Sequence, residues 1–153
     1  MGFDTDMIGP MGYFADLSRT FHCGPAKPTK RQKEIYQMAM AEVEHNLALI
    51  KPGALFSELQ ANAFPVPEEC QENAYPCIVH GVGMCDEYPH LNPSFRGPLP
   101  YDEAVQPGMV LCIESYMGPK EERDGVKLEQ QVVVTDTGYE LLTTYPYEEN
   151  LAG

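Results

Sequence analysis

The chain has 153 residues, of which 43% are hydrophobic and 22% charged, and this composition predicts one globular domain with a substantial core. Its formal net charge is -13 and it has only 10 Lys and Arg residues, which argues against a nucleic-acid backbone as a partner. No run approaches the roughly 20 apolar residues of a membrane helix, and the first residues lack the basic and apolar regions of a signal peptide. We therefore expect a cytoplasmic protein with no nucleic-acid or membrane partner.

The N-terminal segment predicts a hairpin that carries acidic side chains. Residues 3–8 alternate like a strand, so Asp4 and Asp6 should project from the same face. A Gly-Pro-Met-Gly turn follows, and residues 13–21 read as the returning strand, which brings Asp16 back towards the first two acids. The hairpin would thus gather three carboxylates.

The middle of the chain changes to a helical period. Apolar residues recur on one face over residues 29–50, with Thr29 as a suitable N-cap and Lys-Pro-Gly as a stop. A shorter helix is expected over residues 57–63. The loop at residues 89–107 is rich in proline and should be ordered but irregular.

Strands resume after this loop. The β-like runs at residues 108–116 and 126–135 contain Glu114 near the end of the first and Glu129 early in the second. A turn and a last strand at residues 139–144 follow, and we expect the acidic tail after them to be frayed.

Five cysteines form no CxxC pair and are odd in number, so neither a zinc knuckle nor a complete disulfide framework is indicated. We expect reduced, mostly buried thiols, and we interpret Cys85 as a small hydrophobic residue.

The stretch HGVGMCDEYP, which begins at His80, combines a histidine, two glycines and an acid pair. A lone histidine beside apolar residues is usually a packed core residue, and a single strand acid is usually a surface residue. Several acids and one histidine delivered by separate strands, however, are what a two-metal site requires, with ions roughly 3.5 to 4 Å apart. Oxygen-rich ligation suits manganese, iron or zinc.

Four ordered segments resemble metallopeptidase family M24, which has the pita-bread fold: GYFADLSRTF, HGVG, PGMVLCIE and LEQQVVVTDTGYELLT. The resemblance implies an α/β (α+β) fold, namely the C-terminal half of a pita-bread fold, with a curved antiparallel sheet and helices packed on one face. Residues 1–153 would then be a partial catalytic domain whose first half and preceding N-terminal domain are missing. It also implies a homodimer at full length.

The same resemblance implies a set of metal ligands, with two divalent ions expected to be iron and with Mn, Zn or Co as alternatives. Arg19 would be a structural partner for buried acids. The implied ligands are Asp16, His80, Glu114 and Glu129, with Asp4 and Asp6 flanking the place of the remaining aspartate.

Two departures from the peptidase pattern bear on the reaction. Thr5 stands where the peptidases carry their first aspartate, and Asp86 stands where they carry a second histidine that assists peptide cleavage. Both departures resemble DddP-type dimethylsulfoniopropionate lyases, a branch of the same fold. In such an enzyme Asp86 would be the catalytic base, and Tyr75 would line the pocket for the substrate sulfonium, because a cation favours an aromatic face within about 6 Å.

The expected function is therefore a dinuclear-metal lyase that releases dimethyl sulfide and acrylate from this small-molecule substrate. An Xaa-Pro aminopeptidase or dipeptidase is the first alternative. A non-catalytic binding module on the same fold is the second, although such modules usually lack part of the ligand set.

Overall fold

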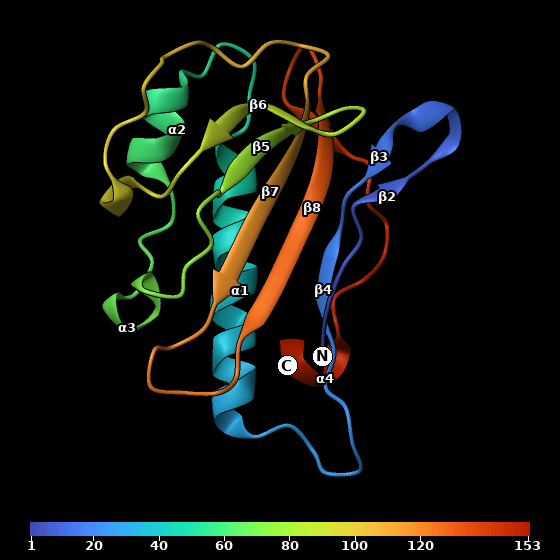
Figure 1. The fold of residues 1–153 in the computed structure, drawn as a ribbon, viewed down its shortest axis with the longest axis vertical. Coiled ribbons are helices and arrows are strands. Elements are labelled where there is room, and N and C mark those ends of the chain that lie inside the picture. The colour runs from blue at the N-terminus through green and yellow to red at the C-terminus, as the bar shows by residue number, and fades with distance from the viewer.

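The computed structural model describes residues 1–153 and is organised around one antiparallel sheet (Figure 1). Its strand order is β6-β5-β7-β8-β9. The long central strands β7 and β8 pair along their whole length, with residues 110–117 opposite 126–133. The strand bounds are Val79–Val82 for β5, Asp86–Leu91 for β6, Val110–Met117 for β7, Val126–Val134 for β8 and Tyr139–Leu141 for β9.

Helix α1 (Lys30–Leu49) covers one face of this sheet and runs along β7 and β8 (Figure 1). It begins as expected at Thr29, whose side chain accepts from the Gln32 amide while the Gln32 side chain accepts from the Thr29 amide. Its apolar face includes Ile35, Tyr36, Ala39 and Val43, all fully buried. Antiparallel strands with helices on one face confirm the expected fold class.

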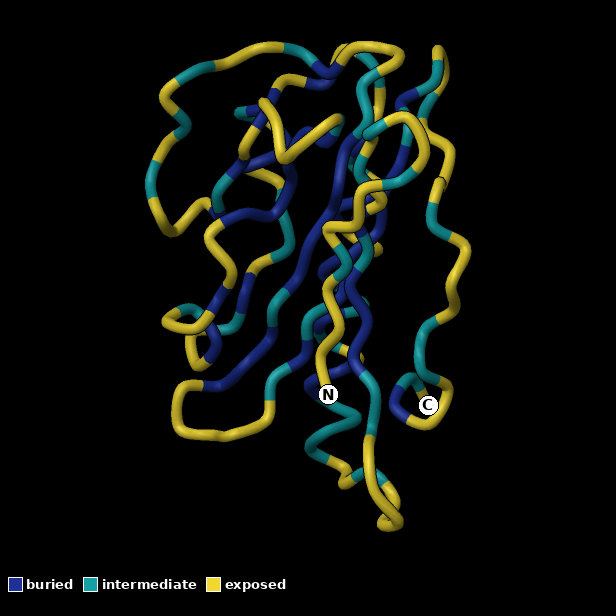
Figure 2. The backbone as a smooth tube through the Cα atoms, turned by 45° about the vertical axis from the view of Figure 1, so that its right-hand side comes forward, coloured by how far each residue is buried: buried dark blue, intermediate teal, exposed yellow.

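Two short helices join α1 to the sheet. Helix α2 (Phe56–Asn62) lies within one residue of the prediction, and α3 (Glu68–Gln71) was not predicted. Buried residues are concentrated along the central strands and the inner face of α1, whereas much of the N-terminal segment is exposed (Figure 2).

The N-terminal hairpin is confirmed, but it is broken into two parts. Strand β1 (Gly2–Asp4) pairs with β4 (Ser18–Thr20), and β2 (Met7–Ile8) pairs with β3 (Phe14–Ala15). The interruption falls at Asp6, which has a positive φ of 32°. The neighbouring Thr5 hydroxyl donates to the Ala15 carbonyl and accepts from the Leu17 amide, at 2.7 and 3.0 Å. Regular strand alternation therefore does not orient the two flanking acids.

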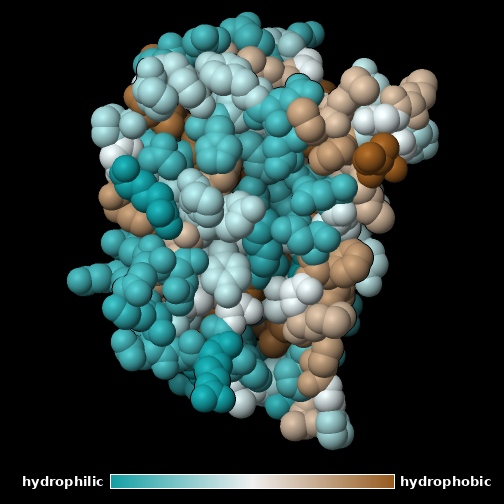
Figure 3. Space-filling model, in the orientation of Figure 1, coloured by the Kyte–Doolittle hydropathy of each residue, from teal (hydrophilic) through white to brown (hydrophobic).

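The hairpin carries an apolar outer surface. Figure 3 shows hydrophobic side chains gathered over β2 and β3 at the right of the molecule. The exposed residues there include Phe3, Met7, Ile8, Met11 and Tyr13.

Arg19 anchors the hairpin to the sheet and is only 2% exposed. Its guanidinium donates to the carbonyls of Ser18, Glu129, Tyr145 and Pro146 and to the side-chain oxygen of Gln130. The expected pairing with buried acids is wrong, because backbone carbonyls take almost all of its donors.

Three local predictions are also wrong. The tail is not frayed: α4 (Glu149–Ala152) packs on α1 and buries Leu151. Strand β6 and a 3-10 turn at Ser94–Arg96 occupy part of the expected irregular loop, because β6 pairs with β5 despite its proline. Cys85 is exposed rather than packed, as is Cys23, whereas the other three thiols are buried and all five are free.

No helix is both long and apolar enough to cross a bilayer.

Glu42 is an acid on the sheet-facing side of α1 and is only 3% exposed. Burial raises its pKa from 4.5 to about 7. Since the unfolded carboxyl ionises first as the pH rises, the fold loses stability between about pH 4.5 and 7. We expect Glu42→Gln to match the wild type near pH 4 and to be more stable by on the order of 2 to 3 kcal/mol near pH 8. Urea unfolding at both pH values measures this.

The exposed Glu44 of the same helix provides the matched control, since Glu44→Gln should leave the pH dependence unchanged. A Glu42→Gln protein whose stability relative to the wild type is the same at both pH values would show that folding does not raise the pKa of Glu42.

Candidate metal centre

Three neighbouring strands place three of the predicted ligands on one face of the sheet. His80 lies on β5, Glu114 on β7 and Glu129 on β8, and the two glutamates are direct cross-strand partners. All three side chains are buried. Like charges placed directly opposite each other repel, so this pair needs a positively charged neighbour.

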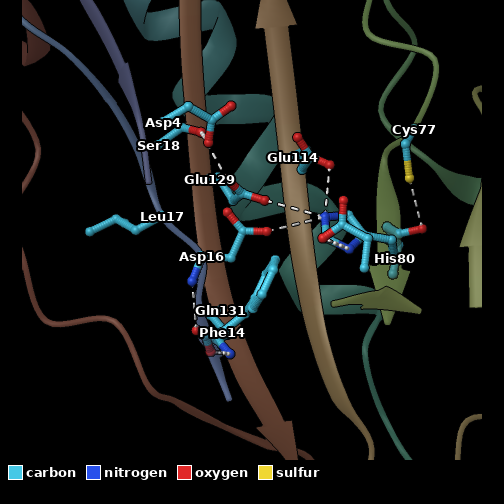
Figure 4. A network of polar contacts seen from close by, with 12 residues as sticks. Asp4, Phe14, Asp16, Leu17, Ser18, Cys77, His80, Glu114, Glu129 and Gln131 are labelled. Carbon is cyan, nitrogen blue, oxygen red and sulfur yellow. Dashed lines mark hydrogen bonds and ion pairs between the residues drawn. The ribbon is translucent and has the colours of Figure 1, made fainter. Parts of the chain in front are cut away.

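The imidazole of His80 points into this cluster (Figure 4). Its Nε2 lies 3.0 Å from Glu114 Oε1, 3.5 Å from Glu129 Oε1 and 3.6 Å from an oxygen of Asp16. The other ring nitrogen lies 3.0 Å from the Gly81 carbonyl. A proton on Nδ1, donated to that carbonyl, would leave the Nε2 lone pair facing the carboxylates, as in a metal-binding histidine.

The hairpin supplies the remaining acids. Asp16 is buried in the short link between β3 and β4, and its amide donates to the Gln131 side chain of β8, which fixes the hairpin against the sheet. Asp4 and Asp6 are exposed at the rim. The Ser18 hydroxyl lies 2.7 Å from Asp4 Oδ1 and 2.8 Å from Glu129 Oε2, and it donates its single proton to one of the two carboxylates at a time, so it links rim and floor.

Asp86 opens strand β6 and faces the same space from the opposite side. Its carboxylate lies 3.9 Å from His80 Nδ1 and its side chain is 62% exposed. Oxygen atoms of Asp6, Asp16 and Asp86 all lie within 4.8 Å of one another.

One small hollow of about 20 Å³ brings every predicted site residue together. This volume accommodates about one water or ion. Its buried floor consists of Asp16, His80, Glu114 and Glu129, and its other lining residues are Asp4, Asp6, Tyr75, Asp86 and Lys127.

The electrostatics of the floor reflect crowded acids. Burial, followed by the nearby Glu129 carboxylate, raises the pKa of Asp16 to about 8. Burial alone would lower the pKa of His80, but its close contacts with the Glu114 and Glu129 carboxylates, at 3.0 and 3.5 Å, outweigh this effect and raise the pKa to about 11. Without a bound metal ion, the imidazole of His80 therefore stays protonated on both nitrogens.

The donor set fits divalent metal ions. Asp16 Oδ1 and Glu129 Oε1 are buried and have no hydrogen-bond partner, which is costly for an acceptor unless a cation binds there. The neighbouring Cys112 sulfur belongs to the same group of potential ligand atoms. Burial and the surrounding acids raise the pKa of this thiol, so the oxygen and imidazole donors are the better ligands for a hard or borderline divalent ion.

Lys127 is a site residue that was not singled out from the sequence. Its ammonium contacts Asp4 and Glu129 at 3.4 and 3.6 Å, and Glu114 more closely. The alternation of strand β8 could have identified it from the sequence, because side chains two residues apart in a strand, such as Lys127 and Glu129, lie on the same face.

Tyr75 borders the site, and Lys127 covers one face of its ring, with Nζ 4.6 Å from the ring centroid. A substrate cation would have to meet the opposite face or the ring edge. A larger adjoining hollow of about 370 Å³ provides room for a bound molecule, lined by Gly2, Phe3, Asp4, Asn73, Tyr75, Tyr116 and Lys127.

Comparison with known proteins agrees with this geometry. The profile of metallopeptidase family M24 matches residues 3–136, so the chain belongs to this family. It is 40% identical over its whole length to dimethylsulfoniopropionate lyase DddP of Roseovarius nubinhibens and covers 34% of that protein. It is 32% identical to the Xaa-Pro dipeptidase of Pyrococcus furiosus over 86% of the chain and 36% of that protein.

Solved structures show the same relationship. The prolidase from Pyrococcus furiosus superimposes with a TM-score of 0.70 and 26% identity, over 89% of this chain and 39% of that protein. The chain therefore spans about a third of the length of its relatives. Family M24 consists of metal-dependent enzymes, and the intact ligand set of this chain is consistent with a dinuclear divalent site.

Glu129 contacts His80, Ser18 and Lys127 and is central to the cluster. We expect Glu129→Gln to weaken metal binding by at least about 100-fold, because it removes a ligand rather than a supporting contact. The metal-free variant should be more stable than the wild type, since one buried repulsive charge is lost. Metal analysis after dialysis against Mn²⁺, together with thermal unfolding in EDTA, measures both effects. Glu140→Gln on exposed β9 is the control, and an undiminished metal content would exclude Glu129 as a ligand.

Proposed function

We propose that the protein containing this chain is a metal-dependent lyase that eliminates dimethyl sulfide from dimethylsulfoniopropionate and leaves acrylate. The observation that carries the proposal is Asp86, an acid on the open rim within 3.9 Å of His80. The whole-length identity of 40% to a lyase of this name supports it.

The acid at this position favours removal of a proton from carbon. An anionic carboxylate is a poor donor to the oxyanion of peptide hydrolysis, but it is a suitable base. Asp86 would take the proton from the carbon beside the substrate carboxylate. The C–H electron pair forms the new C=C bond, and the C–S pair leaves with sulfur as neutral dimethyl sulfide, which needs no protonation.

The other residues of the chain bind and orient. Asp4, Asp6, Asp16, His80, Glu114 and Glu129 would hold the two divalent ions, for which iron remains our prediction. The ions, when bound, would attract the substrate carboxylate and offset the negative charge that develops next to it. Tyr75, at the border of the larger hollow, would face the sulfonium end.

Xaa-Pro dipeptide hydrolysis is the second candidate. It is favoured by the identity of 32% to an Xaa-Pro dipeptidase and by a floor of the same ligand types. The absence of a histidine at the position of Asp86 weighs against it. A non-catalytic module is disfavoured because six acids and a histidine still surround the hollow.

The two activities can be separated with the protein encoded by the complete reading frame, purified and loaded with Fe²⁺ or Mn²⁺. We expect it to release acrylate and dimethyl sulfide from dimethylsulfoniopropionate and to leave a Gly-Pro dipeptide uncleaved. Chromatography of acrylate and of free proline measures both reactions. Cleavage of the dipeptide without release of acrylate would contradict the lyase proposal.

Asp86→Asn tests the base directly. Loss of the proton acceptor should lower kcat by at least about 100-fold, within the usual contribution of general base catalysis, while two metal ions stay bound. Because Asp86 also lies near Asp6 and Asp16, metal content must be measured on the same sample.

The neighbouring Glu87→Gln is the matched control and should retain most activity. Full activity of Asp86→Asn would exclude Asp86 as the base, and loss of an ion would identify it as a ligand instead.

A further inference from the structure

Lys127 divides the oxygens of the two central glutamates between two cations. Glu114 Oε1 and Glu129 Oε1 face His80, whereas the second oxygen of each carboxylate, Oε2, faces the ammonium of Lys127. Ser18 completes this arrangement, since Lys127 Nζ lies 3.0 Å from its hydroxyl and that hydroxyl donates to Glu129 Oε2. Lys127 thus contacts the outer oxygens and leaves the inner ones facing His80.

The lysine is also held in place and shielded. Its side chain is only 11% exposed. Its backbone is fixed by Thr20, because the Lys127 amide donates to Thr20 Oγ1 and that hydroxyl donates to the Lys127 carbonyl. The ring of Tyr75 covers the ammonium from another side. Such a charge is screened much less by salt than a surface lysine.

Among the side chains that line the small hollow, Lys127 and His80 are the only basic ones, against six acids. His80 is a predicted metal ligand and must give up its proton when a metal binds. Lys127 is not a predicted ligand, and its ammonium contacts the carboxylates of Asp4, Glu114 and Glu129 from outside. It is therefore the one basic side chain of the cluster that metal binding does not require to lose a proton.

We propose that Lys127 is a built-in counter-ion that keeps the carboxylates assembled before metal binds and thereby limits the affinity of the site for divalent ions. It is a positioning residue for the ligands rather than a catalytic residue. The inference rests on the metal requirement of the proposed function but not on the substrate.

The charge makes two opposite contributions. In the metal-free protein the ammonium offsets the repulsion between Glu114, Glu129 and Asp4. In the metal-bound protein the same ammonium repels an ion of charge +2 held by the inner oxygens of those side chains, by an amount equivalent to about tenfold or more in affinity even with water-like screening. Removal of the charge should therefore destabilise the first state and favour the second.

The experiment compares Lys127→Met with Lys127→Arg in the protein encoded by the complete reading frame. We expect Lys127→Met to lower the Tm in EDTA, to bind Mn²⁺ about tenfold or more tightly than the wild type, and to gain more in Tm on Mn²⁺ addition. Lys127→Arg keeps the charge and should behave like the wild type. Lys120→Met, which removes an exposed lysine paired with Glu72, is the control for loss of one charge. Calorimetric titration with Mn²⁺ and thermal unfolding give the values.

A second variant separates charge from packing. If lost charge compensation lowers the metal-free Tm, then Glu114→Gln added to Lys127→Met should restore it, whereas a packing defect would remain. A Lys127→Met protein that folds only with Mn²⁺ present supports the proposal as well.

Several results would overturn it. Equal or weaker Mn²⁺ binding by Lys127→Met would show that the lysine orients ligands or only packs, and so would an equal loss of Tm with and without metal. A variant that folds under neither condition, with no rescue by Glu114→Gln, would do the same. A wild-type protein that binds no Mn²⁺, Fe²⁺ or Zn²⁺ would overturn both this inference and the proposed function, whereas metal binding and lyase activity that are unaffected by Lys127→Met would overturn this inference alone.

Discussion

Electrostatic repulsion between buried carboxylates is the constraint that the rest of this structure has to satisfy. Glu114 and Glu129 face each other across the two longest strands, and the buried Asp16 points at the same space. Burying an ion without compensation costs several kcal/mol even after the protein relaxes. The compensating groups, His80 and Lys127, lie on the same face of the same sheet as the two glutamates. The strands that bring the carboxylates together therefore also supply the cations that offset their repulsion.

Arg19 meets a different need although it lies close to the same acids. It donates to backbone carbonyls of the hairpin, of β8 and of the C-terminal segment, and stacks on Tyr147 at 4.6 Å. Strands β4 and β8 belong to different sheets, so the guanidinium joins segments that no strand ladder connects, with partners 110 and 127 residues away in the chain. The hairpin acids keep their place in the site because this connection holds β4 against β8.

The parts that local physics determines were predictable from the sequence. The period and cap of α1, the alternation of β7 and β8, and the grouping of acids all appear where the residues place them. Strand β6 was missed because its proline argues against a central strand, and β6 is an edge strand where proline is tolerated. Helix α4 was missed because a single leucine, Leu151, supplies its buried contact. Lys127 was missed because its neighbours come from distant segments: Ser18 and Thr20 lie 109 and 107 residues away.

The buried residues of the floor and the exposed Asp86 at the rim differ in how freely they can be substituted. Asp16, His80, Glu114 and Glu129 are buried and contact one another, so substitution of any one changes the charge balance of the whole floor. Asp86 is solvated, so exchanging histidine for aspartate there disturbs neither packing nor the floor charges. A rim position can therefore alter the protonation chemistry of the site, from donating to an oxyanion to accepting from carbon, while the metal-binding floor and the fold beneath it stay the same. This division is consistent with a family that contains both a dipeptidase and a lyase, and under the proposed function the exposed Asp86 would decide between the two reactions.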